Sequence, residues 1–161
     1  MKDSKPSKDV FSTALDSLSR SNLSEFELTT RLKRKDYSPD EITEAVEKLK
    51  DYGYLDDRKV VESLLRKAER DCRGPKWLDA YLYKKGVGQS LRDQAREKLL
   101  ELSNSLALQA LENRVQKKCG NLREEKARLY RFLAGRGFLP ESIHWAFDAI
   151  EEERCNDEHQ Q

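Results

Sequence analysis

The stretch LKRKDYSP, residues 32–39, recurs as LYKKGVGQ at residues 82–89 and as LAGRGFLP at residues 133–140. Leu82 follows Leu32 by 50 residues, and Leu133 follows Leu82 by 51. Four further positions match in all three copies: a helix-ending turn residue, the apolar residue after it, an alanine and an aliphatic residue. In order, these are Asp36, Gly86 and Gly137; Tyr37, Val87 and Phe138; Ala45, Ala95 and Ala146; and Leu49, Leu99 and Ile150. A fixed period of this length is typical of helical repeat proteins, although amphipathic helix–turn–helix segments also resemble one another in general.

Apolar residues at helical spacing surround each copy and predict nine helices, three in each repeat. Ser24 and Glu27 have the spacing of a capping box, and Ser38, Pro39 and Glu41 form the clearest helix start in the chain. The sixth and seventh helices are expected at about 91–102 and 104–118, and Asn121 with Glu124 is expected to cap the eighth. Asp56 or Asp57 is expected to cap the fourth helix.

The expected fold is therefore all-α, with three tandem three-helix repeats forming an elongated curved array. We expect a flexible N-terminus at 1–9, repeats at 10–56, 57–102 and 103–152, and an acidic polar tail at 153–161. Only seven glycines and four prolines argue against an all-β protein. A long concave face would suit a long partner, such as a filament or a nucleic acid.

The charge is unevenly distributed, although the net charge is only +1. Residues 39–57 carry seven acids and two bases, whereas residues 58–98 carry twelve bases and six acids, and residues 113–136 carry eight bases and two acids. Basic excess in the second and third repeats favours a polyanionic partner, and ordinary solvated helix faces are the alternative.

Eleven basic residues are the candidate contacts to a partner or to DNA, and aromatic residues are interleaved with them. The candidates are Arg66, Lys67, Arg70, Arg73, Lys76, Lys84, Lys85, Arg123, Lys126, Arg131 and Arg136. Such side chains meet phosphates by charge, which makes binding sensitive to salt. Among the aromatic residues, Trp77 and Phe132 are interpreted as core, and Tyr83 as a surface contact.

No pattern in the chain indicates catalysis, a metal site or a cofactor. Nucleotide-binding loops, nucleophile elbows and HExxH motifs are absent, and His144 is interpreted as a surface residue. The three cysteines, Cys72, Cys119 and Cys155, lack metal-ligand spacing and suggest free thiols in a reducing cytoplasm. The N-terminus does not resemble a signal peptide, and no apolar run is long enough to span a bilayer.

Four sets of motifs, in this order and spacing, resemble the bacterial RecX family over about residues 10–150. They are SEFEL at 24–28 leading to Leu32, GYLDD at 53–57, GP at 74–75 with LYKKGV at 82–87, and KARLYRFL at 126–133 with RGF at 136–138. The resemblance implies a crescent of three tandem three-helix repeats. It also implies a regulator that binds the groove of the RecA–DNA filament and modulates its ATPase and strand exchange, most often by inhibition, in recombinational repair and the SOS response. We expect the chain to be monomeric. The chain departs from the family pattern at Asp36, where glycine is commoner, and at Arg96, where the other repeats have Val46 and Phe147.

Three hypotheses remain open at this point. The first is a RecA modulator that also binds single- or double-stranded DNA through basic residues of the second and third repeats. The second is a helical nucleic-acid-binding module independent of RecA. The third is a general helical scaffold without a polyanionic partner.

Overall fold

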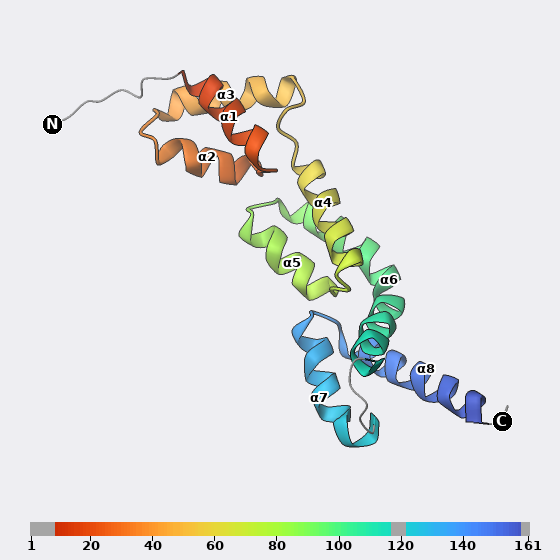
Figure 1. Ribbon diagram of the computed structural model, residues 1–161. Coiled ribbons are helices and arrows are strands. Elements are labelled where there is room, and N and C mark those ends of the chain that lie inside the picture. Colours follow the sequence, from red (N-terminus) through yellow and green to blue (C-terminus); the bar gives the residue numbers. More distant parts are fainter. Residues whose placement is uncertain (1–8, 117–121, 159–161) are drawn as a thin grey trace. The chain divides into compact units, whose positions relative to one another are not determined.

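Every element of the described structure is an α-helix (Figure 1). This computed structural model describes residues 9–116 and 122–158, without the side chains of residues 116, 122–124 and 153–158. The helices are α1 (Val10–Arg20), α2 (Glu25–Lys33), α3 (Pro39–Asp51), α4 (Asp57–Arg70), α5 (Pro75–Lys84), α6 (Gln89–Gln116), α7 (Leu122–Gly135) and α8 (Pro140–Glu158). The predicted all-α class is confirmed.

The helix starts follow the capping signals in the sequence. The Ser24 hydroxyl accepts from the Glu27 backbone N–H at 3.1 Å, and the Glu27 carboxylate accepts from the Ser24 N–H at 3.1 Å. Ser38 and Glu41 form the same box with Pro39 in the first turn of α3. Such reciprocal caps satisfy backbone donors that a helix leaves without internal partners. The cap expected from Asn121 and Glu124 lies outside the described residues.

Asp56 and Asp57 have different roles at the start of α4. The Asp56 carboxylate accepts from the Arg58 N–H at 2.9 Å, as an N-cap does. The Asp57 carboxylate instead accepts from the Glu25 N–H at 2.9 Å and so satisfies the first turn of α2. Burial raises the pKa of Asp57, whereas the hydrogen bond from Glu25 lowers it, and burial is the larger effect.

The predicted break between a sixth and a seventh helix is wrong, because α6 continues from Gln89 to Gln116. No glycine or proline interrupts residues 102–105, and the hydroxyls of the two serines there have hydrogen-bond partners that leave the helix intact. Ser103 is buried and its hydroxyl accepts from the Ser142 hydroxyl at 2.9 Å, while the Ser105 hydroxyl donates to the Leu102 carbonyl at 2.9 Å. Ser103 therefore continues the buried stripe between Leu99 and Ala107 rather than ending it. Leu102 is exposed.

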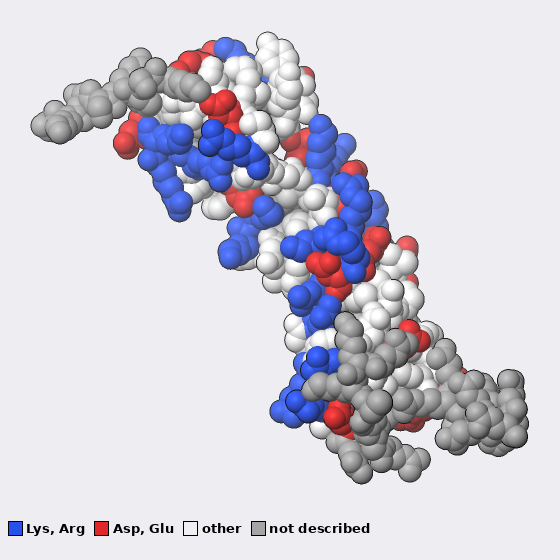
Figure 2. All heavy atoms as spheres, viewed as in Figure 1, with Lys and Arg blue, Asp and Glu red and all other residues white. Residues whose placement is uncertain are grey.

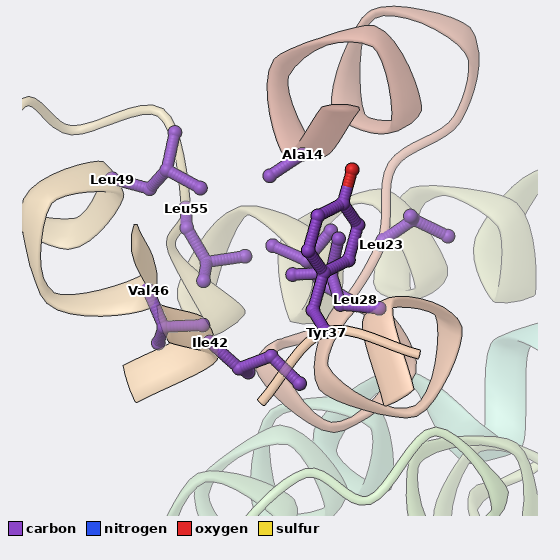
Figure 3. Close-up of a cluster of buried hydrophobic side chains, with 9 residues drawn as sticks. Ala14, Leu23, Leu28, Tyr37, Ile42, Val46, Leu49 and Leu55 are labelled. Carbon is purple, nitrogen blue, oxygen red and sulfur yellow. The ribbon is translucent and has the colours of Figure 1, made fainter. Parts of the chain in front are cut away.

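The chain divides into two compact units, Met1–Ser63 with Leu82–Leu91 and Leu64–Tyr81 with Arg92–Gln161. In the first unit, α1, α2 and α3 enclose a cluster of buried side chains (Figure 3). The cluster consists of Ala14, Leu23, Leu28, Leu32, Tyr37, Ile42, Val46, Leu49 and Leu55. The hydroxyl of Tyr37 points toward α1 in Figure 3 and forms a buried 2.8 Å hydrogen bond with the Thr13 hydroxyl. A buried polar pair of this kind fixes the register of the turn after α2 against α1.

In the second unit, α4 to α8 bury a larger set of apolar side chains, all of them on helical stripes or in the turn after α7. The largest that are fully buried are Leu78, Leu99, Leu111, Leu133, Phe138, Ile143 and Phe147. Leu133 and Phe138 belong to the recurring motif, as Leu32 and Tyr37 do in the first repeat, and both of those are also buried. The motif therefore places equivalent residues in equivalent buried positions.

The start of α2 contacts the turn after α5, which is the equivalent turn of the next repeat. The Ser24 hydroxyl donates a hydrogen bond to the Lys85 carbonyl, and the Lys85 ammonium donates to the Glu27 carboxylate at 2.8 Å. A Cβ on Gly86 would lie 2.4 Å from the ring of Phe26. These contacts join the first repeat to the turn of the second within the first unit.

The same contact recurs in the second unit, between the start of α5 and the turn after α7. The Gly74 N–H donates to the Arg136 carbonyl at 2.9 Å, and the Lys76 N–H donates to the Gly137 carbonyl at 3.0 Å. A Cβ on Gly137 would lie 2.4 Å from the Trp77 backbone nitrogen. Because residues 24 and 74, and residues 86 and 137, are separated by the repeat period, the sequence repeat is also a repeat of contacts.

Candidate nucleic-acid interface

Four arginines line one pocket in the second unit. The pocket has a volume of about 560 Å³ and is bounded by the end of α4, the turn before α5, α6, α7 and the turn after α7. Its lining residues are Arg70, Asp71, Cys72, Arg73, Ala110, Asn113, Arg114, Phe132 and Arg136. This volume is within the range of ordinary ligand pockets. Three of the arginines, Arg70, Arg73 and Arg136, are among the predicted contact residues, and the structure brings them together.

The turn that ends α4 shapes one wall of this pocket. Cys72 has a left-handed backbone, with φ of 47°, and its N–H donates to the Glu69 carbonyl at 3.1 Å. The Arg73 N–H donates to the Ala68 carbonyl at 2.7 Å, which completes a Schellman motif with Cys72 in the position usually held by glycine. The reversal places Arg70 and Arg73 on either side of the turn. Burial of Cys72 raises the pKa of its thiol.

Arg136 joins the two turns that border the pocket. Its Nε donates to the Cys72 carbonyl at 2.9 Å, and its Nη2 donates to the Asp71 carbonyl. The guanidinium carbon also lies 5.2 Å from the centroid of the Phe132 ring. Burial lowers the pKa of Arg136, and the nearby charge of Arg73 lowers it further. Arg136 therefore holds the wall in place and adds its charge to the pocket.

Arg73 and Arg114 contact aromatic faces. The Arg73 guanidinium lies 5.6 Å from the Trp77 ring centroid, and its buried Nε has no hydrogen-bond partner among the described residues. Arg114 lies 5.1 Å from the centroid of Phe132, which is half-buried and lines the pocket rather than belonging to the core. Arg70 pairs with Asp71 at 3.1 Å, but its side chain is 71% exposed, so solvent weakens the pair. Four guanidinium groups and a single carboxylate line the pocket, which makes it electropositive.

The other predicted residues lie outside the pocket. In the second unit, Arg66 and Lys67 are exposed on α4 and Lys76 is exposed on α5. Arg131 is exposed on α7, and its Nε donates to the Ala127 carbonyl at 3.3 Å. Lys126 pairs with Glu151 at 3.3 Å. Arg123 is part of α7, but its side chain lies outside the described residues.

Two predicted residues, Lys84 and Lys85, belong to the first unit. Lys84 is exposed at the end of α5. Lys85 pairs with Glu27 at 2.8 Å, and its side chain is only 21% exposed. The charge of Lys85 therefore stabilises the contact between the first repeat and the turn of the second. Neighbouring Tyr83 is 71% exposed, as its interpretation as a surface residue requires.

Comparison with known proteins identifies the architecture. Residues 11–49 match a family model described as "RecX, first three-helix domain", and residues 103–147 match one described as "RecX, third three-helix domain". The regulatory protein RecX of Chlorobium phaeobacteroides is 30% identical over 89% of this chain and 94% of its own length. The chain belongs to the RecX family. The regulatory protein RecX of Clostridium botulinum is also 30% identical, and there the match covers 78% of this chain but only 60% of that protein.

The RecX fold is confirmed by a solved structure. The crystal structure of RecX from Lactobacillus salivarius has a TM-score of 0.78 to this chain, covers 88% of it, and shares 22% sequence identity. The predicted membership of the family and the three-helix units are thus both supported. None of the helices in the part of the RecX chain that the structure describes is long and apolar enough to cross a membrane.

The predicted contact residues of this RecX chain do not include Arg114 or a second group of basic residues in the first unit. Arg114 was not among the candidates because it lies in the segment predicted as a separate seventh helix, where its proximity to Arg73 could not be foreseen. The second group lies on α1 and α2 in the first unit, where Lys and Arg gather over α2 (Figure 2). It consists of Arg20, Arg31, Lys33, Arg34 and Lys35, and three of these residues line a cleft of about 390 Å³. The basic run at residues 33–35 is visible in the sequence, where basic residues also suit the C-terminal end of a helix dipole.

Proposed function

We propose that this RecX-family protein binds the RecA–DNA filament and restrains its ATPase and strand-exchange activity, and so affects recombinational repair and the SOS response. Membership of a family whose members are named regulatory proteins carries the proposal. The site of action would be the cytoplasm, where the filament forms. The chain would act as a monomer.

Surface charge supports a filament partner that contains nucleic acid. Exposed basic residues lie on α2, α4, α5 and α7, so each of the two compact units has cationic residues on its own surface. Phosphate contacts of this kind set register and affinity without reading sequence. That property suits a regulator of a filament that assembles on DNA of any sequence.

The direct test is to titrate the purified protein into RecA on single-stranded DNA while ATP hydrolysis and strand exchange are followed. We expect both activities to fall at near-stoichiometric ratios. Unchanged activities at those ratios would exclude the proposal.

A charge-reversal variant tests whether basic residues take part. Lys76→Glu with Lys84→Glu is suitable, because both side chains are exposed. Lys85 is better left intact, since its loss would break the ion pair with Glu27. If the double variant acts on RecA as strongly as the parent protein does, a general helical scaffold becomes the better description.

The alternative function is nucleic-acid binding without RecA, and the arginine pocket is the observation that favours it. It predicts DNA retention with a steep salt dependence and no effect on RecA. Measuring DNA binding and RecA ATPase on the same preparation separates the two functions.

A further inference from the structure

We propose that the pocket lined by Arg70, Arg73, Arg114 and Arg136 binds consecutive phosphates of one nucleic-acid strand, and that the adjacent aromatic pair Trp77 and Tyr81 stacks against an unpaired base. The proposal rests on the proposed function in assuming a nucleic-acid partner. It goes further in naming the pocket, the chemical group that it takes and the form of the strand.

The residues that line the pocket carry an excess of positive charge. The four guanidinium groups face one carboxylate, Asp71, which pairs with the outermost of them, Arg70. An excess of three positive charges therefore remains. A single carboxylate would neutralise one of them, whereas a nucleic-acid strand delivers one negative charge with every nucleotide.

The donors within the pocket suit phosphate oxygens. Arginine presents a planar fork of N–H groups that matches phosphate geometry and holds its charge at any physiological pH. The Arg73 Nε has no hydrogen-bond partner among the described residues, and the Arg114 guanidinium lies over the ring of Phe132 with no ion pair to a described carboxylate. Both side chains can therefore meet a ligand without giving up an existing carboxylate. Arg136 acts mainly as a positioning residue, because N–H groups on its Nε and Nη2 already donate to the carbonyls of Cys72 and Asp71.

An aromatic stack continues from the pocket along α5. The guanidinium of Arg73 lies 5.6 Å from the Trp77 ring centroid, and the rings of Trp77 and Tyr81 are 4.5 Å apart with an angle of 32° between their planes. The side chain of Tyr81 is 42% exposed. Cationic grooves next to exposed aromatic rings are the arrangement by which proteins bind single strands, because every base has a face that can stack. Paired bases in a duplex cannot offer that face.

The first experiment tests whether the pocket binds the phosphates of a single strand. Binding of the full chain to a fluorescein-labelled oligothymidylate is measured by fluorescence anisotropy over a range of salt concentrations. The variant Arg73→Gln with Arg114→Gln removes two phosphate ligands, and the slope of log affinity against log salt should become shallower by about 1.4. The single variant Arg114→Gln should change the slope by about 0.7. The matched control is Arg96→Gln, which removes the same charge from α6 but outside the pocket, where Arg96 pairs with Asp93 at 3.3 Å. Thermal melts of all variants, followed by circular dichroism, establish that they are folded.

Tyr81→Ala tests the stacking part. Removing one stacked base should weaken binding of the oligothymidylate about tenfold while leaving the salt slope unchanged. Equal affinities for Tyr81→Ala and the parent protein would overturn the single-strand assignment.

Two competitors identify the anion. Pyrophosphate and a polyglutamate peptide are each added to the complex at matched total charge, and we expect the oligothymidylate to resist both. Displacement by pyrophosphate would show a site for free phosphate, and displacement by polyglutamate would show a site for an acidic protein segment; either result overturns the proposal. The same is true if the parent protein does not bind the oligomer, or if the pocket variants and Arg96→Gln have equal slopes. If the slopes change as expected while RecA ATPase is unaffected, the pocket assignment stands and the proposed function fails.

Discussion

The substitution Gly137→Ala tests whether the recurring contact between repeats holds the second unit together. Gly137 ends α7 with φ of 90°, and its carbonyl accepts from the Lys76 N–H at 3.0 Å. An added Cβ would lie 2.4 Å from the Trp77 nitrogen and 2.8 Å from its Cβ. The obstructing atoms belong to or adjoin the backbone of α5, so they cannot move aside without separating the turn from that helix.

The expected cost has three parts. A left-handed backbone costs an ordinary residue about 1–2 kcal/mol relative to glycine. Overpacking of a rigid site costs about 1–3 kcal/mol. Weakening the hydrogen bond from Lys76 adds about 1 kcal/mol. We therefore expect Gly137→Ala to lower the free energy of unfolding by about 3–6 kcal/mol, which is a large fraction of the stability of a typical domain.

Two other glycines separate these contributions. Gly74 has no positive φ, but its added Cβ would lie 2.3 Å from the carbonyl carbon of Gly137, so Gly74→Ala carries the contact cost without the strain. Gly135 has neither a positive φ nor an atom within 4 Å of an added Cβ, so alanine there should be neutral or stabilise by up to about 1 kcal/mol.

Urea denaturation of the three variants, with linear extrapolation, gives the free energies. The expected order of stability is Gly135→Ala, then Gly74→Ala, then Gly137→Ala. If Gly137→Ala unfolds within about 1 kcal/mol of Gly135→Ala, the contact between the repeats does not stabilise the unit, and the reasoning fails.

Three further predictions concern buried polar groups. Ser103→Ala or Ser142→Ala alone should lower the free energy of unfolding by about 1–2 kcal/mol, because each leaves a buried hydroxyl without its partner. The double variant should lose less than the sum of the two, and a double-mutant cycle measured by urea denaturation checks this. Arg136→Lys should destabilise the second unit by about 2–3 kcal/mol in the same assay, since lysine cannot reach both carbonyls with a planar fork; stability equal to that of the parent would show that only the charge matters. Burial raises the pKa of Cys72, so the unfolded thiol ionises before the folded one, and stability should fall as the pH rises above about 8.5; a Cys72→Ala variant that loses as much stability over that range would contradict this sign.

The helix starts and the repeat could be predicted because they depend on local chemistry. Ser24 with Glu27 and Ser38 with Glu41 satisfy donors within a single turn, so four residues of sequence carry the whole signal. The break expected between residues 102 and 104 is wrong, because Ser103 and Ser105 lie inside α6. Serine signals a helix start only if its hydroxyl caps, and here one hydroxyl bonds across to Ser142 and the other to its own helix. The partner of Ser103 is 39 residues away, so nothing near it in the sequence could reveal the outcome.

The candidate site could be predicted only in part, because charge is visible in the sequence but the approach of distant segments is not. Charge counting found Arg70, Arg73 and Arg136 as members of basic segments, but it could not rank them above Lys67 or Arg131, which lie outside the pocket. These three arginines come together because the turn after α4 meets the turn after α7, 64 residues further along the chain. The hydrogen bond from Arg136 to the Cys72 carbonyl fixes that contact. Arg114 lines the same pocket from α6, about 40 residues along the chain from Arg73, so its place there depends on tertiary packing and not on a local signal.

Asp36 shows how the structure explains a departure from a repeat. The turns at Gly86 and Gly137 must satisfy two conditions, a positive φ and room for the preceding repeat, and only glycine satisfies both. Asp36 has a φ of 61° but is exposed, so the first condition alone applies, and aspartate tolerates that backbone better than most residues. In this chain, glycine is required at the two turns that a neighbouring repeat crowds, and it can be replaced at the exposed turn of Asp36. Asp36 is the residue that departs from the repeat in the sequence. Because it is exposed, the stacking of the repeats does not require glycine at this position.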